Sequence, residues 1–170
     1  MDVRMLTKMA LLVALLCVSA YISFPIPFSP AMVTLLTFTM CLVAFLLPPK
    51  QTFIVLIVYL LLGAVGLPVF TGGKSGIAAL VGPTGGYYLA WPVAYTLLSI
   101  FKGTQKKVIP YTIRAVLITV PITYIGGMIG LMIVLGFSLE KAFMTGALPF
   151  IFGDTLKAIV AAWLATKIRI

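Results

Sequence analysis

Long apolar runs occupy most of this 170-residue chain and leave only short segments between them. The runs cover residues 9–22, 31–47, 52–66, 87–101, 112–135 and 148–168. A helix that crosses a bilayer needs about 20 mainly apolar residues, and soluble domains carry about 25% charged residues. Here only 9% of the residues are charged and 62% are hydrophobic. We therefore predict an all-α integral membrane protein, a single domain over residues 1–170 with six transmembrane helices.

Basic residues are distributed unevenly between the two ends of these predicted helices. If the N-terminus lies inside, two basic residues, Lys74 and Lys141, fall on the outer side, and nine fall on the inner side. The nine are Arg4, Lys8, Lys50, Lys102, Lys106, Lys107, Arg114, Lys167 and Arg169. Cytoplasmic loops of membrane proteins are rich in Lys and Arg, so we predict that both termini are cytoplasmic. The orientation of the chain in the membrane then explains the net charge of +9, and we expect no nucleic-acid partner.

Between the third and fourth predicted helices, residues 63–86 hold eight of the fifteen glycines. Glycine disfavours a continuous helix, so we expect a Gly-rich loop on the outer side. Irregular backbone at membrane depth is tolerated where it lines a cavity, and glycine lets a ligand approach the backbone closely. Tyr87, Tyr88 and Trp91 follow directly. They form either an apolar wall of a pocket or part of the aromatic belt at the membrane surface.

The residue types of familiar enzyme chemistry are missing or isolated. Histidine is absent, which excludes His-based zinc motifs and nucleophile pairs. Residues 73–75 (Gly-Lys-Ser) match the end of a phosphate-binding P-loop, but Pro68 stands where that motif needs its first glycine. Asp154 follows a glycine as in one half of an intramembrane aspartyl protease site, but it has no second carboxylate beside it. We therefore predict no catalytic residues, no metal site and no ATPase site.

The sixth predicted helix carries two charged residues, Asp154 and Lys157, deep within its apolar sequence. Each costs about 2.5–3.5 kcal/mol at a helix centre on insertion scales, so a compensating interaction is expected. Their i,i+3 spacing puts them on one face, where they can neutralise each other. Alternatively, they form an outward-opening site in which Lys157 binds a carboxylate and Asp154 accepts hydrogen bonds from ligand N–H groups. The second interpretation predicts a pocket for an anionic, amide-like small molecule.

Small residues at four-residue spacing mark three candidate contact faces on the predicted helices. They are Ala10 with Ala14, Gly126 with Gly130, and Ala158 with Ala162. Ordinary packing inside one bundle explains any of these pairs equally well, so spacing alone does not identify a partner interface.

Four motifs taken together are typical of one transporter family. They are residues 66–73 (GLPVFTGG) with Gly76, residues 82–87 (GPTGGY), residues 25–30 (PIPFSP) with residues 33–35, and residues 153–158 (GDTLKA). In this combination the chain resembles the BioY family, the biotin-specific S components of energy-coupling factor (ECF) vitamin transporters. The resemblance implies six helices in a prokaryotic cell membrane and capture of biotin from outside. It also implies assembly with a transmembrane T subunit, which would meet Ala10 and Ala14, and with two ATPase subunits that supply the ATP hydrolysis.

The resemblance also implies which residues bind the substrate. They are Asp154, Lys157, Tyr87, Tyr88, Thr84, Gly72, Gly73 and Gly86. Asp154 and Lys157 would hold the ureido ring and the valerate carboxylate of biotin, and from its charge we assign the carboxylate to Lys157. Two other functions stay open, an S component for another small vitamin and a self-sufficient secondary transporter. The single membrane carboxylate and the lack of a convincing internal repeat weaken the secondary transporter.

Overall fold

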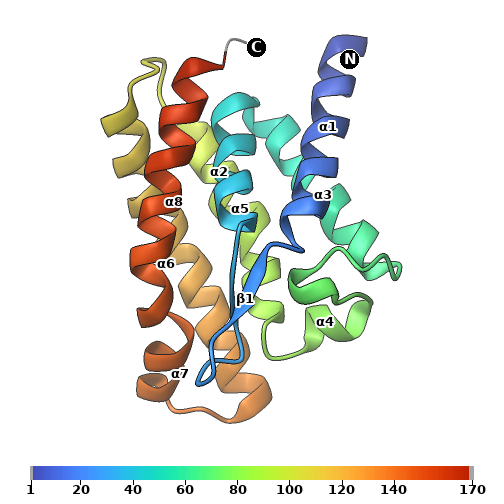
Figure 1. Ribbon diagram of the computed structural model, residues 1–170, viewed down its shortest axis with the longest axis vertical. Helices are drawn as coiled ribbons and strands as arrows, with labels where there is room; N and C mark the ends of the chain where they lie inside the picture. Colours follow the sequence, from blue (N-terminus) through green and yellow to red (C-terminus); the bar gives the residue numbers. More distant parts are fainter. Residues whose placement is uncertain (1, 169–170) are drawn as a thin grey trace.

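The computed structural model describes residues 2–168, so Arg169, counted above among the inner basic residues, lies outside them. Within that range, helices of 11 or more residues pack side by side as a bundle (Figure 1). They are α1 (Val3–Ser19), α2 (Leu36–Leu46), α3 (Pro49–Ala64), α5 (Gly85–Phe101), α6 (Val108–Leu135) and α8 (Leu148–Lys167). By length and composition α6 and α8 can cross a membrane, whereas α2 and α3 are apolar but shorter.

The two ends of the bundle differ in what they carry. The start of α1 and the end of α8 lie at one end, together with the α2–α3 and α5–α6 connections (Figure 1). The shorter elements lie towards the opposite end, and they are β1 (Ser23–Pro25), β2 (Met32–Thr34), the 3₁₀ turn η1 (Thr71–Gly73), α4 (Ile77–Val81) and α7 (Leu139–Gly146). The described basic residues that we predicted to be on the inner side therefore gather at one end of the bundle.

A β-hairpin occupies the region where we expected the second helix to begin. β1 pairs antiparallel with β2, with Phe24 opposite Val33, and α2 starts only at Leu36. Prolines between residues 25 and 30 lack the N–H that a helix needs and favour extended backbone. Thr34 Oγ1 then accepts a hydrogen bond from the Leu36 N–H at 3.2 Å, at the start of α2. The expected run 31–47 includes this strand because the sequence pattern of a short apolar segment does not distinguish a strand from a helix.

The other helices differ from the expected runs mainly at their ends. We expected runs over residues 9–22, 52–66, 87–101, 112–135 and 148–168. The helices observed in their place cover, in the same order, residues 3–19, 49–64, 85–101, 108–135 and 148–167. The first turns of α1 and α3 explain their earlier starts, since the Asp2 side chain accepts from the Arg4 N–H at 3.4 Å and Pro49 stands in the first turn of α3. Helix α7 was not expected at all. It is capped by Ser138, whose Oγ accepts a hydrogen bond from the Lys141 N–H at 3.2 Å.

Helix α2 lies at the centre of the bundle, since eight of its eleven residues are buried. A hydrogen bond of 2.6 Å between Ser19 Oγ and Thr39 Oγ1 joins it to α1. At its C-terminal end, the Lys102 ammonium donates to main-chain carbonyls between Ala44 and Leu47 at 2.5–3.0 Å. These carbonyls have no partners within the helix, so Lys102 supplies the hydrogen-bond donors that the helix end lacks.

Helices α5 and α6 cross with their backbones in contact. A Cβ atom added at Gly86 would lie 2.0 Å from the Gly126 carbonyl oxygen and 3.1 Å from the Gly130 nitrogen. Such a close approach requires small residues on both helices. The Gly126–Gly130 pair predicted from its spacing therefore packs inside the bundle.

The two alanine pairs differ in whether they are buried or exposed. Ala158 and Ala162 on α8 are buried inside the bundle. Ala10 and Ala14 lie on an exposed face of α1. Of the three small-residue pairs, the one on α1 is thus the pair left open to another molecule in the described part of the chain.

The Gly-rich segment folds as a cap that is packed onto the bundle. The Phe70 ring is fully buried and stacks on Tyr88 with the ring centroids 4.7 Å apart. The Tyr59 hydroxyl donates to the Val69 carbonyl oxygen at 2.8 Å. The segment is therefore held by a buried aromatic side chain, although its glycines disfavour a regular helix.

Candidate functional site

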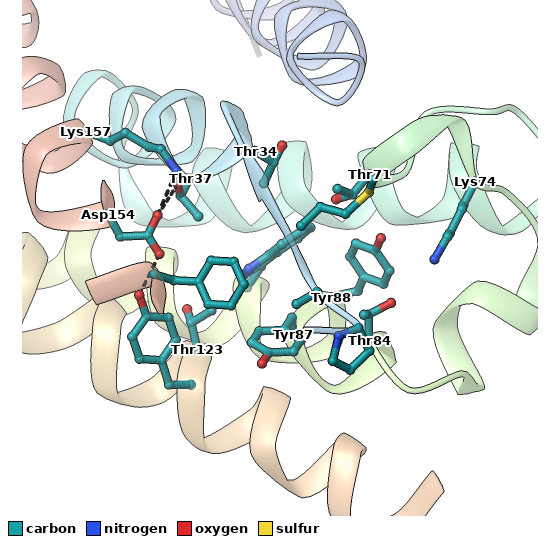
Figure 2. Close-up of a pocket in the computed structure, with 16 residues that line it drawn as sticks. Thr34, Thr37, Thr71, Lys74, Thr84, Tyr87, Tyr88, Thr123, Asp154 and Lys157 are labelled. Carbon is teal, nitrogen blue, oxygen red and sulfur yellow. Dashed lines mark hydrogen bonds and ion pairs between the residues drawn. The ribbon is translucent and has the colours of Figure 1, made fainter. Parts of the chain in front are cut away.

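A cavity lies between the helices, near the end that carries the hairpin and the cap (Figure 2). The lining residues are Pro30, Ala31, Met32, Thr34, Thr37, Thr71, Lys74, Thr84, Tyr87, Tyr88, Trp91, Thr123, Tyr124, Phe150, Asp154 and Lys157. They come from the hairpin, α2, the Gly-rich segment, α5, α6 and α8, so the cavity exists only when most of the chain is folded.

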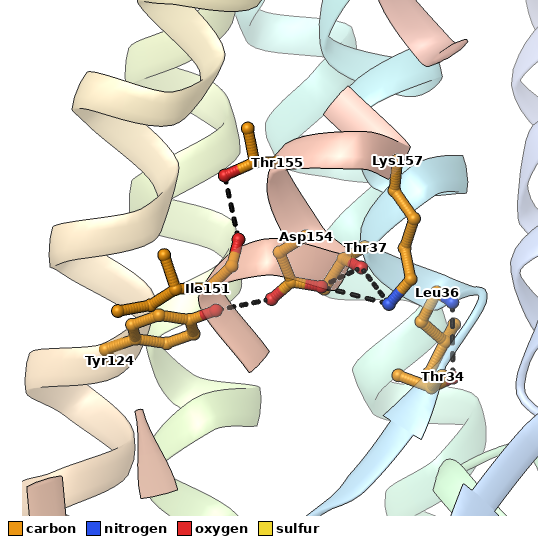
Figure 3. A network of polar contacts seen from close by, with 8 residues as sticks. All are labelled: Thr34, Leu36, Thr37, Tyr124, Ile151, Asp154, Thr155 and Lys157. Atoms are coloured by element: carbon orange, nitrogen blue, oxygen red, sulfur yellow. Dashed lines mark hydrogen bonds and ion pairs between the residues drawn. The ribbon is translucent and has the colours of Figure 1, made fainter. Parts of the chain in front are cut away.

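On one side of the cavity, Asp154 on α8 is held by side chains from three helices (Figure 3). Its Oδ1 accepts hydrogen bonds from Lys157 Nζ at 3.0 Å and from Thr37 Oγ1 at 2.9 Å. Its Oδ2 accepts one from the Tyr124 hydroxyl at 2.8 Å. Lys157 Nζ also donates to Thr37 Oγ1 at 3.3 Å. The two charges are in contact, as one of the two interpretations of their spacing has it, and α2 and α6 fix the orientation of the pair.

The charges of Asp154 and Lys157 neutralise each other, and both side chains also face the cavity. The side chains of Lys157 and Asp154 remain 18% and 13% exposed, and both line the cavity. Two unit charges about 4 Å apart interact by about 4 kcal/mol at an effective dielectric constant of about 20. A second anion brought to Lys157 would therefore meet a comparable repulsion from Asp154. As a unit, the pair offers a donor and an acceptor side by side to a polar group without net charge.

Aromatic side chains of α5 form the apolar wall of the cavity. Tyr87, Tyr88 and Trp91 are 8%, 2% and 4% exposed, so they lie inside the bundle and not in a belt on its outer surface. The rings of Tyr88 and Trp91 meet edge to face, with centroids 4.8 Å apart. The Tyr87 hydroxyl donates to the Gly146 carbonyl oxygen at 2.6 Å, which fixes its ring against α7.

The structure brings five of the eight predicted substrate-binding residues into this cavity. They are Asp154, Lys157, Tyr87, Tyr88 and Thr84. Gly86 lies in the crossing of α5 with α6. Gly72 and Gly73 lie in η1, where each has a φ of 73° in the left-handed region that suits glycine. These three glycines set the course of the backbone, and the neighbours of η1, Thr71 and Lys74, line the cavity.

No recognisable signal in the sequence marked Thr37, Thr123 or Tyr124 as lining residues. Thr37 and Tyr124 lie 117 and 30 residues from Asp154 in the sequence. No short spacing therefore links them to Asp154, and a single hydroxyl group in an apolar helix does not indicate a binding site. The Thr123 hydroxyl and the Trp91 indole N–H are buried and have no hydrogen-bond partner within residues 2–168. Buried polar groups are nearly always hydrogen-bonded in proteins, so both groups are available to a ligand.

Lys74 lies across the cavity from Lys157 (Figure 2). Its backbone is held in place, because its carbonyl oxygen accepts from the Phe70 N–H at 3.0 Å. Its side chain is exposed, and its ammonium has no ion-pair or hydrogen-bond partner among the residues that the structure describes. The sequence had singled out this lysine only as part of an incomplete P-loop motif.

The bundle and its internal cavity define a helical membrane protein with a site for a small molecule. The sequence model of the BioY family matches residues 1–170, and the chain belongs to this family. The resemblance inferred from the four sequence motifs is thereby confirmed.

Individual relatives match along most of their length. The chain is 36% identical over 169 residues to the probable biotin transporter BioY of Pyrococcus horikoshii, which covers 99% of this chain and 98% of that protein. It is 40% identical over 165 residues to the biotin transporter BioY2 of Lactococcus lactis subsp. cremoris, covering 91% and 84%. The fold matches the crystal structure of the S-component for biotin from an ECF-type ABC transporter, with a TM-score of 0.90 and 30% identity over 97% of this chain and 90% of that one.

Proposed function

We propose that this chain is the biotin-binding S component of an ECF-type transporter. The observation that carries the proposal is the Asp154–Lys157 pair, set in a small-molecule cavity and held in place by Thr37 and Tyr124. Charged groups in apolar helices are costly and usually functional. A hydrogen-bond acceptor beside a donor suits a ligand that carries both N–H and C=O groups, as the ureido ring of biotin does.

The cavity wall suits the rest of such a ligand. Tyr88 and Trp91 present ring faces and edges to the cavity, and aromatic side chains bind the apolar faces of a bicyclic ring by burying their surface. Tyr87 and Thr84 complete this side of the site. In the proposed complex, the polar groups of the ligand meet the ion pair while its carbon skeleton packs along α5.

In the proposed topology six helices span a prokaryotic plasma membrane, with both termini in the cytoplasm. The basic residues at the end that holds the start of α1 and the end of α8 support this orientation. The cavity, near the opposite end, then opens to the outside, where the vitamin is captured.

Transport by this chain requires partner subunits in the proposed assembly. The T subunit docks on α1 at Ala10 and Ala14, whose exposure leaves a smooth helix face for close contact. Two ATPase subunits supply the ATP hydrolysis. The chain itself acts by binding its substrate and is not an enzyme.

Calorimetric titration of the purified chain in detergent with biotin, thiamine and riboflavin tests the substrate. We expect one biotin per chain and no heat of binding with the other two vitamins. Binding of thiamine or riboflavin in place of biotin would refute the proposal. Reconstitution in liposomes tests the transport class, because uptake of biotin against its gradient by the chain alone, driven by an ion gradient, would identify a secondary transporter.

A further inference from the structure

We infer that a water molecule binds in a second, smaller cavity beside Asp154 and joins its carboxylate to hydroxyl groups of α5 and α6. The inference concerns the folded chain itself and does not rest on the proposed function. Six of the eight residues that line this cavity carry a side-chain oxygen, and they are Thr37, Tyr95, Thr119, Thr123, Tyr124 and Asp154. Four of these six also line the main cavity, so the two cavities adjoin around the Asp154 carboxylate.

The Thr123 hydroxyl is the group that needs a ligand here. Thr123 is 4% exposed and lies on the Asp154 side of the main cavity (Figure 2). Its Oγ1 is buried, and no group within residues 2–168 forms a hydrogen bond with it. Buried polar groups are nearly always paired, and an ordered water supplies the partner where the protein does not. The second cavity has room for about one water molecule.

The other oxygen atoms around this cavity can complete the hydrogen bonds of a water molecule. A carboxylate has about four acceptor positions, and Asp154 uses three of them within the described chain. Thr119 gives its proton to the Ala115 carbonyl oxygen at 2.8 Å, so its Oγ1 can still accept. The hydroxyls of Thr123 and Tyr95 can donate. A water molecule that accepts from these two hydroxyls and donates to Asp154 and Thr119 has four partners, within the usual two to four.

The charges beside the cavity favour water over a metal cation. The Lys157 ammonium already lies 3.0 Å from Asp154 Oδ1 and neutralises the carboxylate. A cation bound to the same carboxylate would be repelled by that ammonium, and this repulsion is stronger inside a protein than in bulk water. A water molecule brings no charge and leaves the ion pair intact. Through Tyr95, it also adds α5 to the helices that hold Asp154.

Thermal unfolding of the full-length chain in detergent, without biotin, tests this site with two matched variants on α6. Thr123→Val replaces the hydroxyl by a methyl group of similar size and should lower the melting temperature by about 2–4 °C, because the water loses a partner. Thr112→Val is the control. The Thr112 hydroxyl is also buried without a partner in the described chain but lines neither cavity, so its loss should leave the melting temperature unchanged or raise it. A Thr123→Val chain at least as stable as the wild type would overturn the inference.

A crystal structure of the biotin-free chain, at a resolution that shows ordered water, gives a direct readout that does not need Thr123→Val to fold. We expect a density peak at hydrogen-bonding distance from Thr123 Oγ1 in the wild type and in Thr123→Ser, which keeps the hydroxyl. The peak should be lost in Thr123→Val. A wild-type map without the peak would overturn the inference.

Sodium is the competing occupant, and unfolding in sodium chloride and in choline chloride at equal ionic strength separates it from water. We expect the wild type to melt at the same temperature in both salts. A higher melting temperature in sodium chloride that Thr123→Val abolishes would identify a cation site and overturn the assignment to water. These measurements use no transported ligand, so their outcome is independent of whether the chain binds biotin.

Discussion

The Tyr124 hydroxyl lies 2.8 Å from Oδ2 of Asp154 and joins α6 to α8 at the wall of the cavity. Thr37 reaches the other oxygen of the same carboxylate from α2. The orientation of Asp154 is therefore set by two neighbouring helices before any ligand arrives. Preorganisation of this kind improves affinity, because the ordering cost is met in folding and not in binding.

Asp154→Asn or Lys157→Ala should weaken biotin binding tenfold or more. Each change removes one partner of a charge-assisted hydrogen bond, worth about 1.5–3 kcal/mol, and leaves the other charge unpaired in an apolar bundle. Calorimetric titration gives the affinity, and thermal unfolding in detergent checks that the variant is folded. Unchanged affinity in a folded variant would mean that the pair serves only to hold α8 in place.

Tyr124→Phe should weaken biotin binding about three- to tenfold, because it removes one hydrogen bond to a carboxylate while keeping the ring. Tyr111→Phe is the matched control. That ring stacks on Phe45 with centroids 4.5 Å apart and lines no part of the cavity. The same titration measures both variants. Equal affinities for the two would show that the Tyr124 hydroxyl does not position Asp154.

Gly86→Ala should lower stability by about 1–3 kcal/mol or more, in the range seen for overpacked cores. The added Cβ would stand 2.0 Å from a backbone oxygen of α6, and backbone atoms cannot move aside as a flexible side chain can. Gly153→Ala is the control, since a Cβ there meets nothing within 4 Å. It should be neutral or gain up to about 1 kcal/mol from helix propensity. Thermal unfolding compares the two, and similar melting temperatures would refute the close crossing.

Ala14→Trp should abolish assembly with the T subunit and leave biotin binding by the isolated chain unchanged. A bulky ring on this exposed face blocks close approach of another helix. Leu117→Trp is the control, because Leu117 on α6 is 69% exposed and lies outside the proposed interface. Co-purification with the T subunit measures assembly. Retention of the complex by Ala14→Trp would move the interface to another face.

Lys102→Met should destabilise the fold by about 1–2 kcal/mol at neutral pH, because the carbonyls at the end of α2 lose their hydrogen-bond donor. Lys107→Met, at an exposed position of the same loop, should change stability little. Thermal unfolding in detergent measures both variants. A Lys102→Met protein as stable as the wild type would show that this contact contributes nothing.

The same lysine also predicts a pH dependence. Burial, and to a smaller extent the charge of Lys106, lowers the pKa of Lys102 to about 8, against about 10.4 in an unfolded chain. Between these values the unfolded chain binds more protons, so this group makes the folded state more stable as pH rises. From about pH 8 to 10, the stability of the wild type should therefore improve relative to Lys102→Met. A constant difference across that range would contradict the shift.

The polar contacts of the site show how far sequence reasoning reaches. Asp154 and Lys157 stand three residues apart, so helix geometry alone predicts that they share a face. Thr37 and Tyr124 could not be found in this way. A threonine in an apolar helix often bonds only its own backbone, as Thr119 does with the Ala115 carbonyl oxygen at 2.8 Å. Nothing local distinguishes such a threonine from one that reaches across to another helix.

The sequence by itself determined that the chain is helical, that it belongs in a membrane and that two charges meet within one apolar helix. These properties depend on composition and on the spacing of residues close together in the sequence, and neither depends on how the chain finally packs. The tertiary structure alone decided that Gly86 serves a helix crossing, that three helices hold Asp154 and that Lys74 faces Lys157 across one cavity. These depend on which distant segments pack together, and no local pattern records the neighbours that a side chain acquires on folding.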